Sequence, residues 1–267
     1  MDVSTAQTLD RSRPDGLIVV GHGTRDDRGC AEFAELVNLV TGLAPKTTVE
    51  GCFLELVEPD LIGGVERAIR RGARRLAVVP LLLVSAGHAK RDIPRLVAAA
   101  AAQFPEATIE QRPHLGSHAA ISELAQRRYE ESLKNLPPRP NDQTLLVVVG
   151  RGTKDEGANA ALGAFARQRA AQTGAGRHET CFLAMAEPSL ERALGLLPQL
   201  ALPRIVVEPH LLFQGELLDR IRGMVAAAAA RWPAREFVVT DRLGPDSDLA
   251  EAILELAGIV KPPAAQP

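Results

Sequence analysis

The sequence predicts an α/β protein of two similar domains, each a parallel β-sheet flanked by helices, related by internal duplication. Short apolar runs alternate with segments of helical periodicity, and motifs of the first half return 129 residues later. Gly21-His22-Gly23-Thr24 returns as Gly150-Arg151-Gly152-Thr153, and Cys52-Phe53-Leu54-Glu55 returns as Cys181-Phe182-Leu183-Ala184. The 267-residue chain therefore suits two domains better than one.

Four strand–helix units follow one another in the first half. An apolar run ended by a glycine predicts a strand at 17–20, and the spacing of Phe33, Leu36 and Val40 predicts the helix after it. The same reasoning predicts strands at 17–20, 49–54, 76–83 and 108–111, and helices at 28–43, 59–71, 89–102 and 118–133.

The second half repeats this order, with strands predicted at 145–149, 178–183, 205–212 and 236–239. Nearly continuous apolar strands that alternate with helices favour parallel sheets covered on both faces. Three prolines within 135–142 predict a stiff linker. We therefore expect domains at 14–134 and 143–258, and a flexible tail at 259–267, where few apolar groups are available for burial.

Composition limits the partners. The net charge is −2, from 31 basic and 33 acidic side chains, so no strong field attracts nucleic acid or an anionic membrane. No segment approaches ~18 unbroken apolar residues, the length of a membrane span. Three cysteines without a CxxC pair argue against a disulfide framework. We expect a cytoplasmic protein with no nucleic-acid or membrane partner.

Three positions break the repeat. His22 becomes Arg151, Glu55 becomes Ala184, and His88 becomes Leu217. Each first-half residue follows an expected strand at its carboxyl end, where open parallel sheets bind ligands. Two imidazoles and a carboxylate at one rim are able to hold a divalent transition metal and to accept protons. The alternative for each histidine is a hydrogen-bonding role in a turn.

Retained positions indicate architecture instead. Gly21 and Gly23 recur, which is typical of a tight strand-to-helix turn. Glu58-Pro59 returns as Glu187-Pro188 and predicts a helix start with proline at the first helical position. Cys52 and Cys181 share a strand position and are expected to be buried apolar residues.

The remaining histidines are expected outside the chemistry. His114 and His118 lie near the fourth strand, where surface or capping roles, or a place at the cleft edge, are expected. His178 and His210 belong to the second half and are not assigned a direct role. Neither half contains a P-loop or a complete dinucleotide loop, and Gly21 stands before His22, where a histidine phosphatase has an arginine.

Three motifs together resemble those of the sirohydrochlorin chelatases, a family of class II tetrapyrrole chelatases. They are Val-Gly-His-Gly-Thr-Arg at 20–25, Phe-Leu-Glu-Leu-Val-Glu-Pro at 53–59, and Val-Pro-Leu-Leu-Leu-Val-Ser-Ala-Gly-His-Ala-Lys-Arg-Asp-Ile-Pro at 79–94. The resemblance extends through 150–153 and 209–213, as in the long, internally duplicated members.

The resemblance implies a lyase that inserts Co²⁺ or Fe²⁺ into sirohydrochlorin without ATP, on the route to cobalamin or to siroheme; nickel also stays open. His22 and His88 match the metal-binding and catalytic histidines, and Glu55 matches an acidic residue that aids metal capture or proton removal. The divalent ion is a substrate, and no permanently bound cofactor or iron–sulfur cluster is expected. Long members are expected to be monomers whose two halves imitate a dimer, with the active site in the first half and the second half as a cleft wall.

Cationic side chains near these histidines are candidates for binding the substrate carboxylates. They are Arg25, Lys90, Arg91 and Arg151. The alternative for each is an ordinary solvated surface. Two other functions remain as alternatives: a carrier that binds metal or tetrapyrrole without catalysis, and an unrelated α/β hydrolase or phosphatase.

Overall fold

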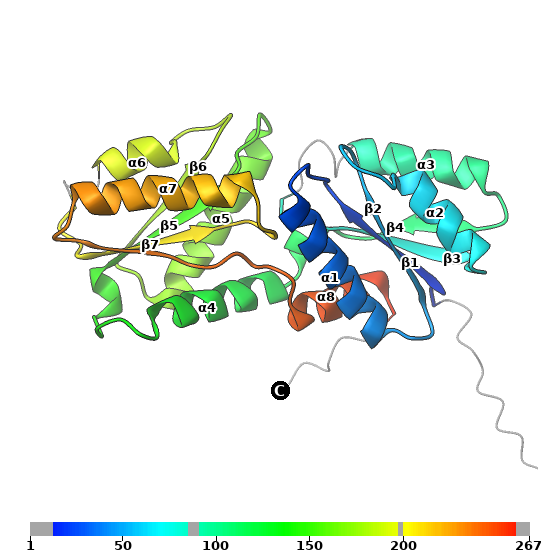
Figure 1. Ribbon diagram of the computed structural model, residues 1–267, viewed down its shortest axis with the longest axis horizontal. Helices are drawn as coiled ribbons and strands as arrows, with labels where there is room; N and C mark the ends of the chain where they lie inside the picture. The colour runs from blue at the N-terminus through cyan, green and yellow to red at the C-terminus, as the bar shows by residue number, and fades with distance from the viewer. Residues whose placement is uncertain (1–12, 85–90, 197–199, 260–267) are drawn as a thin grey trace, which may run out of the picture.

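Two four-stranded parallel sheets with equivalent strand orders form the framework of the computed structural model (Figure 1). The structure describes residues 13–84, 91–196 and 200–259. The strand orders are β2-β1-β3-β4 and β6-β5-β7-β8, and each pair of neighbours is parallel. The predicted α/β class and its internal duplication are confirmed.

The elements of the two halves correspond one to one, apart from two short 3₁₀ helices. The first half contains β1 (Gly16–Gly21), α1 (Asp27–Leu43), β2 (Thr48–Phe53), α2 (Leu61–Arg70), β3 (Arg75–Pro80), α3 (Ile93–Gln103), β4 (Thr108–Gln111), η2 (Leu115–Ser117) and α4 (Ala120–Leu133). The second half contains η3 (Asn141–Gln143), β5 (Thr144–Gly150), α5 (Glu156–Thr173), β6 (Arg177–Phe182), α6 (Leu190–Leu196), β7 (Arg204–Pro209), α7 (Glu216–Arg231), β8 (Glu236–Val239) and α8 (Ser247–Ala257).

Several predicted boundaries differ from the structure. Helices expected from residues 89 and 118 begin at Ile93 and Ala120, and residues 89 and 90 lie outside the described part of the chain. The strands expected to reach residues 83 and 212 end at Pro80 and Pro209, since a proline has no N–H to continue the ladder. The helix expected from residue 59 begins at Leu61, because the Asp60 carboxylate accepts a hydrogen bond from the Gly63 N–H at 2.7 Å and caps it. The prediction of Pro59 as the first helical residue is therefore wrong.

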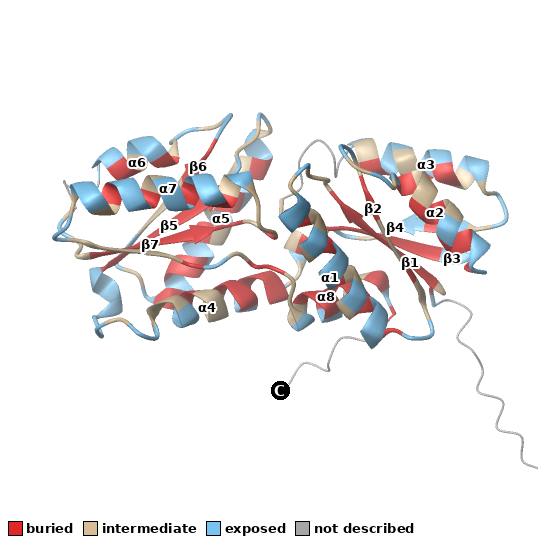
Figure 2. Cartoon of the chain, in the orientation of Figure 1, coloured by how far each residue is buried: buried red, intermediate tan, exposed pale blue. Residues whose placement is uncertain are grey.

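Each sheet is covered on both faces, and its strands are the most deeply buried part of the fold (Figure 2). In the first half, alternate strand residues face two different helix pairs. Ile18 and Val20 pack with α2 and α3, whereas Leu17 and Val19 pack with α1. This alternation follows from the period of two along a strand.

The last helix of each half crosses over to the other half. Helix α8, at the end of the chain, packs beside α1 on the first sheet, where Ile253 belongs to the same core as Leu17 (Figure 1). Helix α4 packs on the second sheet, where Tyr129 joins the core around Leu146. The sequence repeats and the packed units therefore differ by an exchange of these two helices.

The residues at the ends of the two repeats are held by packing. In the proposed linker, the Pro137 carbonyl accepts a hydrogen bond from Arg204 Nη2 at 2.6 Å, and Arg139 pairs with Glu236 at 3.3 Å. Ile259, expected to begin a flexible tail, is 2% exposed and belongs to the core beneath α8. Residues 260–267 lie outside the described part of the chain. No helix within the described ranges is both long and apolar enough to cross a bilayer.

Candidate active site

The carboxyl ends of both sheets face each other across the junction between the halves (Figure 1). On one side of the junction the segment after β7 reaches α1, where Phe213 meets Phe33 edge-on at 6.2 Å between ring centroids. The Gln214 N–H donates to the Glu32 carboxylate at 2.7 Å. The rim on which the sequence places its candidate residues therefore lies at an interface between the two halves.

His22 and Glu55 meet at this rim. His22 Nε2 lies 3.5 Å from Glu55 Oε1, and their side chains are 30% and 47% exposed. His22 follows β1 directly, and Glu55 stands two residues beyond β2. Because β1 and β2 are adjacent parallel strands, their ends deliver the imidazole and the carboxylate to one place.

The backbone around this pair is tightly joined. The Leu54 N–H donates to the Gly21 carbonyl at 3.0 Å, and the Glu55 N–H donates to the His22 carbonyl at 3.2 Å. Gly23 adopts a φ of +100°, and a Cβ atom built there would stand 1.9 Å from the Glu55 carbonyl oxygen. Glycine is required at this turn because a side chain would separate the two segments that carry His22 and Glu55.

The second half has the same turn without the chemistry. The Ala184 N–H donates to the Arg151 carbonyl at 2.9 Å, and a Cβ atom on Gly152 would stand 1.9 Å from the Ala184 carbonyl oxygen. The glycines thus serve the turn in both halves, as their retention predicts. The imidazole and the carboxylate are present only in the first half of this shared scaffold.

Glu58 is structural in both copies. Its Oε2 accepts the Asp60 N–H at 2.9 Å, and the equivalent Glu187 Oε2 accepts the Ser189 N–H at 2.9 Å. The peptide bonds Glu58-Pro59 and Glu187-Pro188 are both cis. The assignment of Glu58 to architecture is confirmed, although it supports a turn before the helix cap and not a proline within the helix.

The described residues contain no group of three or more His, Cys, Asp or Glu side chains arranged to hold a metal ion. His22 and Glu55 form a pair, and His88, the third residue expected here, lies outside the described residues, as does Lys90. Cys52 and Cys181 are buried and unpaired, and burial raises the pKa of both thiols, that of Cys181 to about 12. Their expected role as apolar strand residues is confirmed, since neither is disposed to ionise.

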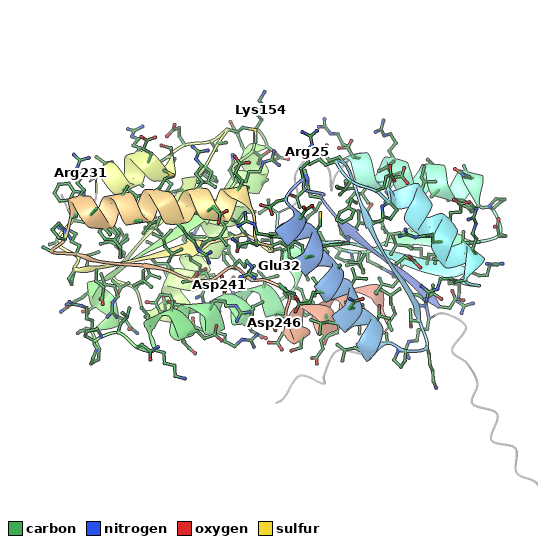
Figure 3. All side chains as sticks on the ribbon, viewed as in Figure 1. Arg25, Glu32, Lys154, Arg231, Asp241 and Asp246 are labelled. Atoms are coloured by element: carbon green, nitrogen blue, oxygen red, sulfur yellow. The ribbon has the colours of Figure 1, made fainter. Side chains whose placement is uncertain are left out.

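Three of the candidate cations are exposed: Arg25, Arg91 and Arg151. Within the described residues none of the three forms an ion pair. Lys154 occupies the position equivalent to Arg25 and is also exposed. Figure 3 shows Arg25 and Lys154 on either side of the junction, at the same edge of the molecule. Two loops that correspond in the repeat thus present positive charge at this edge.

A cavity of about 310 Å³ at the same junction is lined by two histidines that were expected to lie outside the chemistry. His114 and His210 share it with apolar side chains that include Leu83 and Phe165. His114 Nδ1 lies 2.9 Å from the Leu82 carbonyl oxygen, and the His210 ring is 4.5 Å from Phe165 between centroids. Burial lowers the pKa of His210 to about 4, so its imidazole is neutral at pH 7. His210 has no repeat partner, since Leu81 stands there, and that difference was the available signal.

His118 has a structural role. Its Nδ1 accepts the Ala120 N–H at 3.2 Å at the start of α4, and its Nε2 lies 3.2 Å from Glu255 Oε2 of α8. The expected capping role is confirmed. His178 is the second residue of β6, at the amino end of the strand and therefore opposite the rim.

The fold is that of a duplicated α/β protein of the chelatase type, and a histidine–carboxylate pair stands at the rim of its first half only. The chain belongs to the CbiX family, whose model matches residues 16–132 and 145–258. The resemblance to sirohydrochlorin chelatases is thereby confirmed.

Relatives and solved structures agree with this membership. A sirohydrochlorin ferrochelatase of Priestia megaterium is 28% identical over 239 residues, covering 90% of this chain and 88% of that protein. A sirohydrochlorin cobaltochelatase of the same organism is 30% identical over 210 residues, covering 78% of this chain and 68% of that protein. The structure of SirB from Bacillus subtilis with Fe³⁺ superposes with a TM-score of 0.79 at 26% identity, covering 91% of this chain and 94% of that one.

Proposed function

We propose that this protein is a sirohydrochlorin chelatase, a lyase that inserts Co²⁺ or Fe²⁺ into sirohydrochlorin without ATP. The observation that carries the proposal is the approach of His22 Nε2 to Glu55 Oε1, 3.5 Å apart at the rim between the halves. The names of the relatives support the reaction, since they are ferrochelatases and cobaltochelatases acting on sirohydrochlorin.

The chemistry of insertion matches these side chains. Insertion of a divalent ion releases two protons from the ring nitrogens, so the site needs a metal ligand and a base on the same side. An imidazole and a carboxylate supply both, and their moderate affinity lets the ion pass to the macrocycle. We assign metal binding to His22 and His88, and assistance in metal capture or proton removal to Glu55.

The substrate carboxylates need cationic partners. We assign this role to Arg25, Arg91 and Arg151, which are exposed, and to Lys90. The first repeat, 14–134, performs the insertion, and the second, 143–258, forms the opposite wall of the cleft. The two halves of one chain supply both walls, so the functional unit is a monomer. Three unpaired cysteines support a reducing cytoplasm as its location.

Anaerobic turnover tests the function. Catalytic amounts of protein are mixed with sirohydrochlorin and Co²⁺, Fe²⁺ or Ni²⁺, and the absorption change is compared with the uncatalysed reaction. His22→Ala and Glu55→Ala are expected to lower kcat/KM by about a hundredfold, the usual range for a lost acid–base group. His178→Ala, at the opposite sheet edge, is the matched control and keeps the wild-type rate.

Two results would contradict the proposal. Stoichiometric binding of metal or tetrapyrrole with no turnover indicates a carrier. Wild-type rates in both His22→Ala and Glu55→Ala mean that the site is elsewhere. The relative kcat/KM values for cobalt, iron and nickel decide which metal the protein handles, and with it the pathway to cobalamin or to siroheme.

Arg151 separates substrate binding from metal binding, because it replaces His22 in the half that lacks the metal site. Arg151→Ala is expected to raise the Kd for sirohydrochlorin by about tenfold, as for one lost charge-assisted hydrogen bond, with an unchanged Kd for Co²⁺. Titration of each ligand alone measures the two constants. An equal loss of both affinities would argue against carboxylate binding.

A further inference from the structure

Leu56 and Met185 adopt a backbone conformation that their side chains disfavour. Their φ angles are 72° and 60°, and within the described residues no other non-glycine residue has a positive φ. A residue with a Cβ atom in this region costs about 1–2 kcal/mol relative to the ordinary helical region. Both residues stand at the same position of the repeat, directly after Glu55 and Ala184.

These two side chains are also exposed. The exposed fractions are 51% for Leu56 and 52% for Met185, so neither contributes the full burial that would offset its conformation. The fold itself is better served at such a position by glycine or asparagine. An apolar residue has nevertheless been kept in both halves, whereas Glu55, one position earlier, was replaced by alanine.

The loops that carry them are firmly anchored. The Phe53 N–H donates to the Pro59 carbonyl at 2.9 Å, and the Phe182 N–H donates to the Pro188 carbonyl at 3.0 Å. Each loop leaves its strand and is tied back to it a few residues later. Leu56 and Met185 therefore project from rigid loops, which is the arrangement expected of preorganised contact residues.

Their place in the fold points to the substrate. Leu56 is adjacent to Glu55, which contacts His22, and Met185 holds the corresponding place in the half that faces this rim. A tetrapyrrole has flat apolar ring faces and carboxylates at its periphery. Exposed apolar side chains on rigid loops match the ring faces, while the exposed cations of the rim match the periphery.

We propose that Leu56 and Met185 bind the apolar ring of the tetrapyrrole substrate, one from each half of the chain, and position it over the His22–Glu55 pair. This inference rests on the proposed function and assigns a substrate-binding role to residues shared by both repeats. Binding buries their exposed side chains and so offsets the unfavourable backbone conformation.

The test replaces each residue with asparagine, which tolerates positive φ and removes the apolar surface. Leu56→Asn and Met185→Asn are each expected to raise the Kd for metal-free sirohydrochlorin by about tenfold, measured by absorption titration. The Kd for Co²⁺ is expected to stay unchanged, and the Tm to stay equal or rise. Leu43→Asn is the matched control, since Leu43 is 47% exposed at the far end of α1, and it keeps the wild-type Kd.

Each outcome decides the matter. An unchanged Kd for sirohydrochlorin in both variants of a wild-type enzyme that turns over overturns the inference and leaves the function standing. A fall in Tm together with weaker binding shows a structural role and also overturns it. A wild-type protein that neither binds nor metallates sirohydrochlorin overturns the proposed function, and the inference with it.

Discussion

Arg169 of α5 and Glu208 of β7 form an ion pair that is almost wholly withdrawn from solvent, with side chains 0% and 4% exposed. Three hydrogen bonds of 3.1–3.2 Å join them. Arg169 Nη1 also donates to the side-chain carbonyls of Gln126 at 2.8 Å and Gln172 at 2.7 Å. Burial raises the pKa of Glu208, although Arg169 opposes the shift by favouring the charged carboxylate.

This network is present at only one of the two places where a helix packs on the sheet of the other half. Gln126 belongs to α4, which packs on the second half. At the equivalent places of the other junction stand Val40, Val79 and Leu254, all buried and apolar. Helix α4 on the first sheet would bury an unpaired amide, and α8 on the second would leave Arg169 short of a partner. The network thus specifies which helix covers which sheet.

Removing one member of the Arg169–Glu208 pair is expected to destabilise the protein more than removing both. Arg169→Val and Glu208→Val each leave one charge buried without its partner, and each should lower the free energy of unfolding by about 3–5 kcal/mol. The double variant has valine at both positions, as the first half does at Val40 and Val79. It should lose less stability than either single variant. Urea denaturation measures all four proteins. A double variant that loses the sum of the two single changes would show that the pair is not coupled.

A second ion pair closes one side of the junction. The carboxylate of Glu32, which Figure 3 labels, accepts from Arg242 Nε at 2.9 Å and from the Gln214 N–H at 2.7 Å. The side chains of Glu32 and Arg242 are 15% and 20% exposed. The equivalent residues on the other side are Ala161 and His114, which line the cavity of about 310 Å³. The two sides of the junction therefore differ: an ion pair closes one side, and the other side contains the cavity.

Loss of the Glu32–Arg242 ion pair is expected to destabilise the protein measurably. Glu32→Ala removes the acceptor of the Gln214 N–H and one of the two carboxylate partners of the mostly buried Arg242, which keeps Asp241 at 2.9 Å. The variant should lower the free energy of unfolding by about 2 kcal/mol. Glu66→Ala is the control, because its pair with Arg70 is exposed at the surface and should change stability by less than about 0.5 kcal/mol. Equal effects in urea denaturation would contradict a special role for Glu32.

The duplication made the fold predictable but concealed the helix exchange. Alternating strands and helices identify two parallel sheets, because the period of two or 3.6 in apolar residues is set by local geometry. The periodicity of α4 and α8 shows that each buries one face, and it does not show on which sheet. That choice depends on Arg169 and Glu208, which are distant in sequence and meet only in the folded chain.

The candidate site was predictable only where the halves differ. His22 and Glu55 emerged because Arg151 and Ala184 replace them. The sequence did not indicate Leu56 and Met185, because positions retained in both halves are typical of architecture. Their backbone angles and exposure, which no pattern of residue types reveals, are the signal that separates them from the glycines of the turn.

Gly23 gives a direct test of the turn that joins His22 to Glu55. Gly23→Ala combines an unfavourable φ of +100° with a Cβ atom 1.9 Å from the Glu55 carbonyl oxygen. The expected loss is about 3 kcal/mol in the free energy of unfolding, together with weaker Co²⁺ binding as Glu55 is displaced.

Gly72 is the matched control for that change. Its φ is +99°, and a Cβ atom there would meet nothing within 4 Å. Gly72→Ala should therefore show only the backbone penalty of about 1 kcal/mol, with Co²⁺ binding intact. If both variants lose the same stability in urea denaturation and both bind Co²⁺ normally, the close approach at Gly23 does not hold Glu55 in place.

His210 predicts how stability depends on pH. Its pKa is lowered from 6.5 to about 4, mainly because burial disfavours the imidazolium, while a hydrogen bond with the Leu83 backbone opposes the shift. Below pH 6.5 the unfolded chain binds a proton that the folded chain refuses, so stability falls as the pH drops from 6.5 towards 4. The fall attributable to this residue is about 3 kcal/mol, at roughly 1.4 kcal/mol per pH unit.

His210→Leu, which installs the residue found at the equivalent Leu81, should remove that part of the pH dependence, whereas His178→Ala should keep it. Urea denaturation at intervals between pH 7 and pH 4 measures the three profiles, and parallel profiles for His210→Leu and the wild type would mean that His210 accepts its proton in the folded protein as readily as in the unfolded chain.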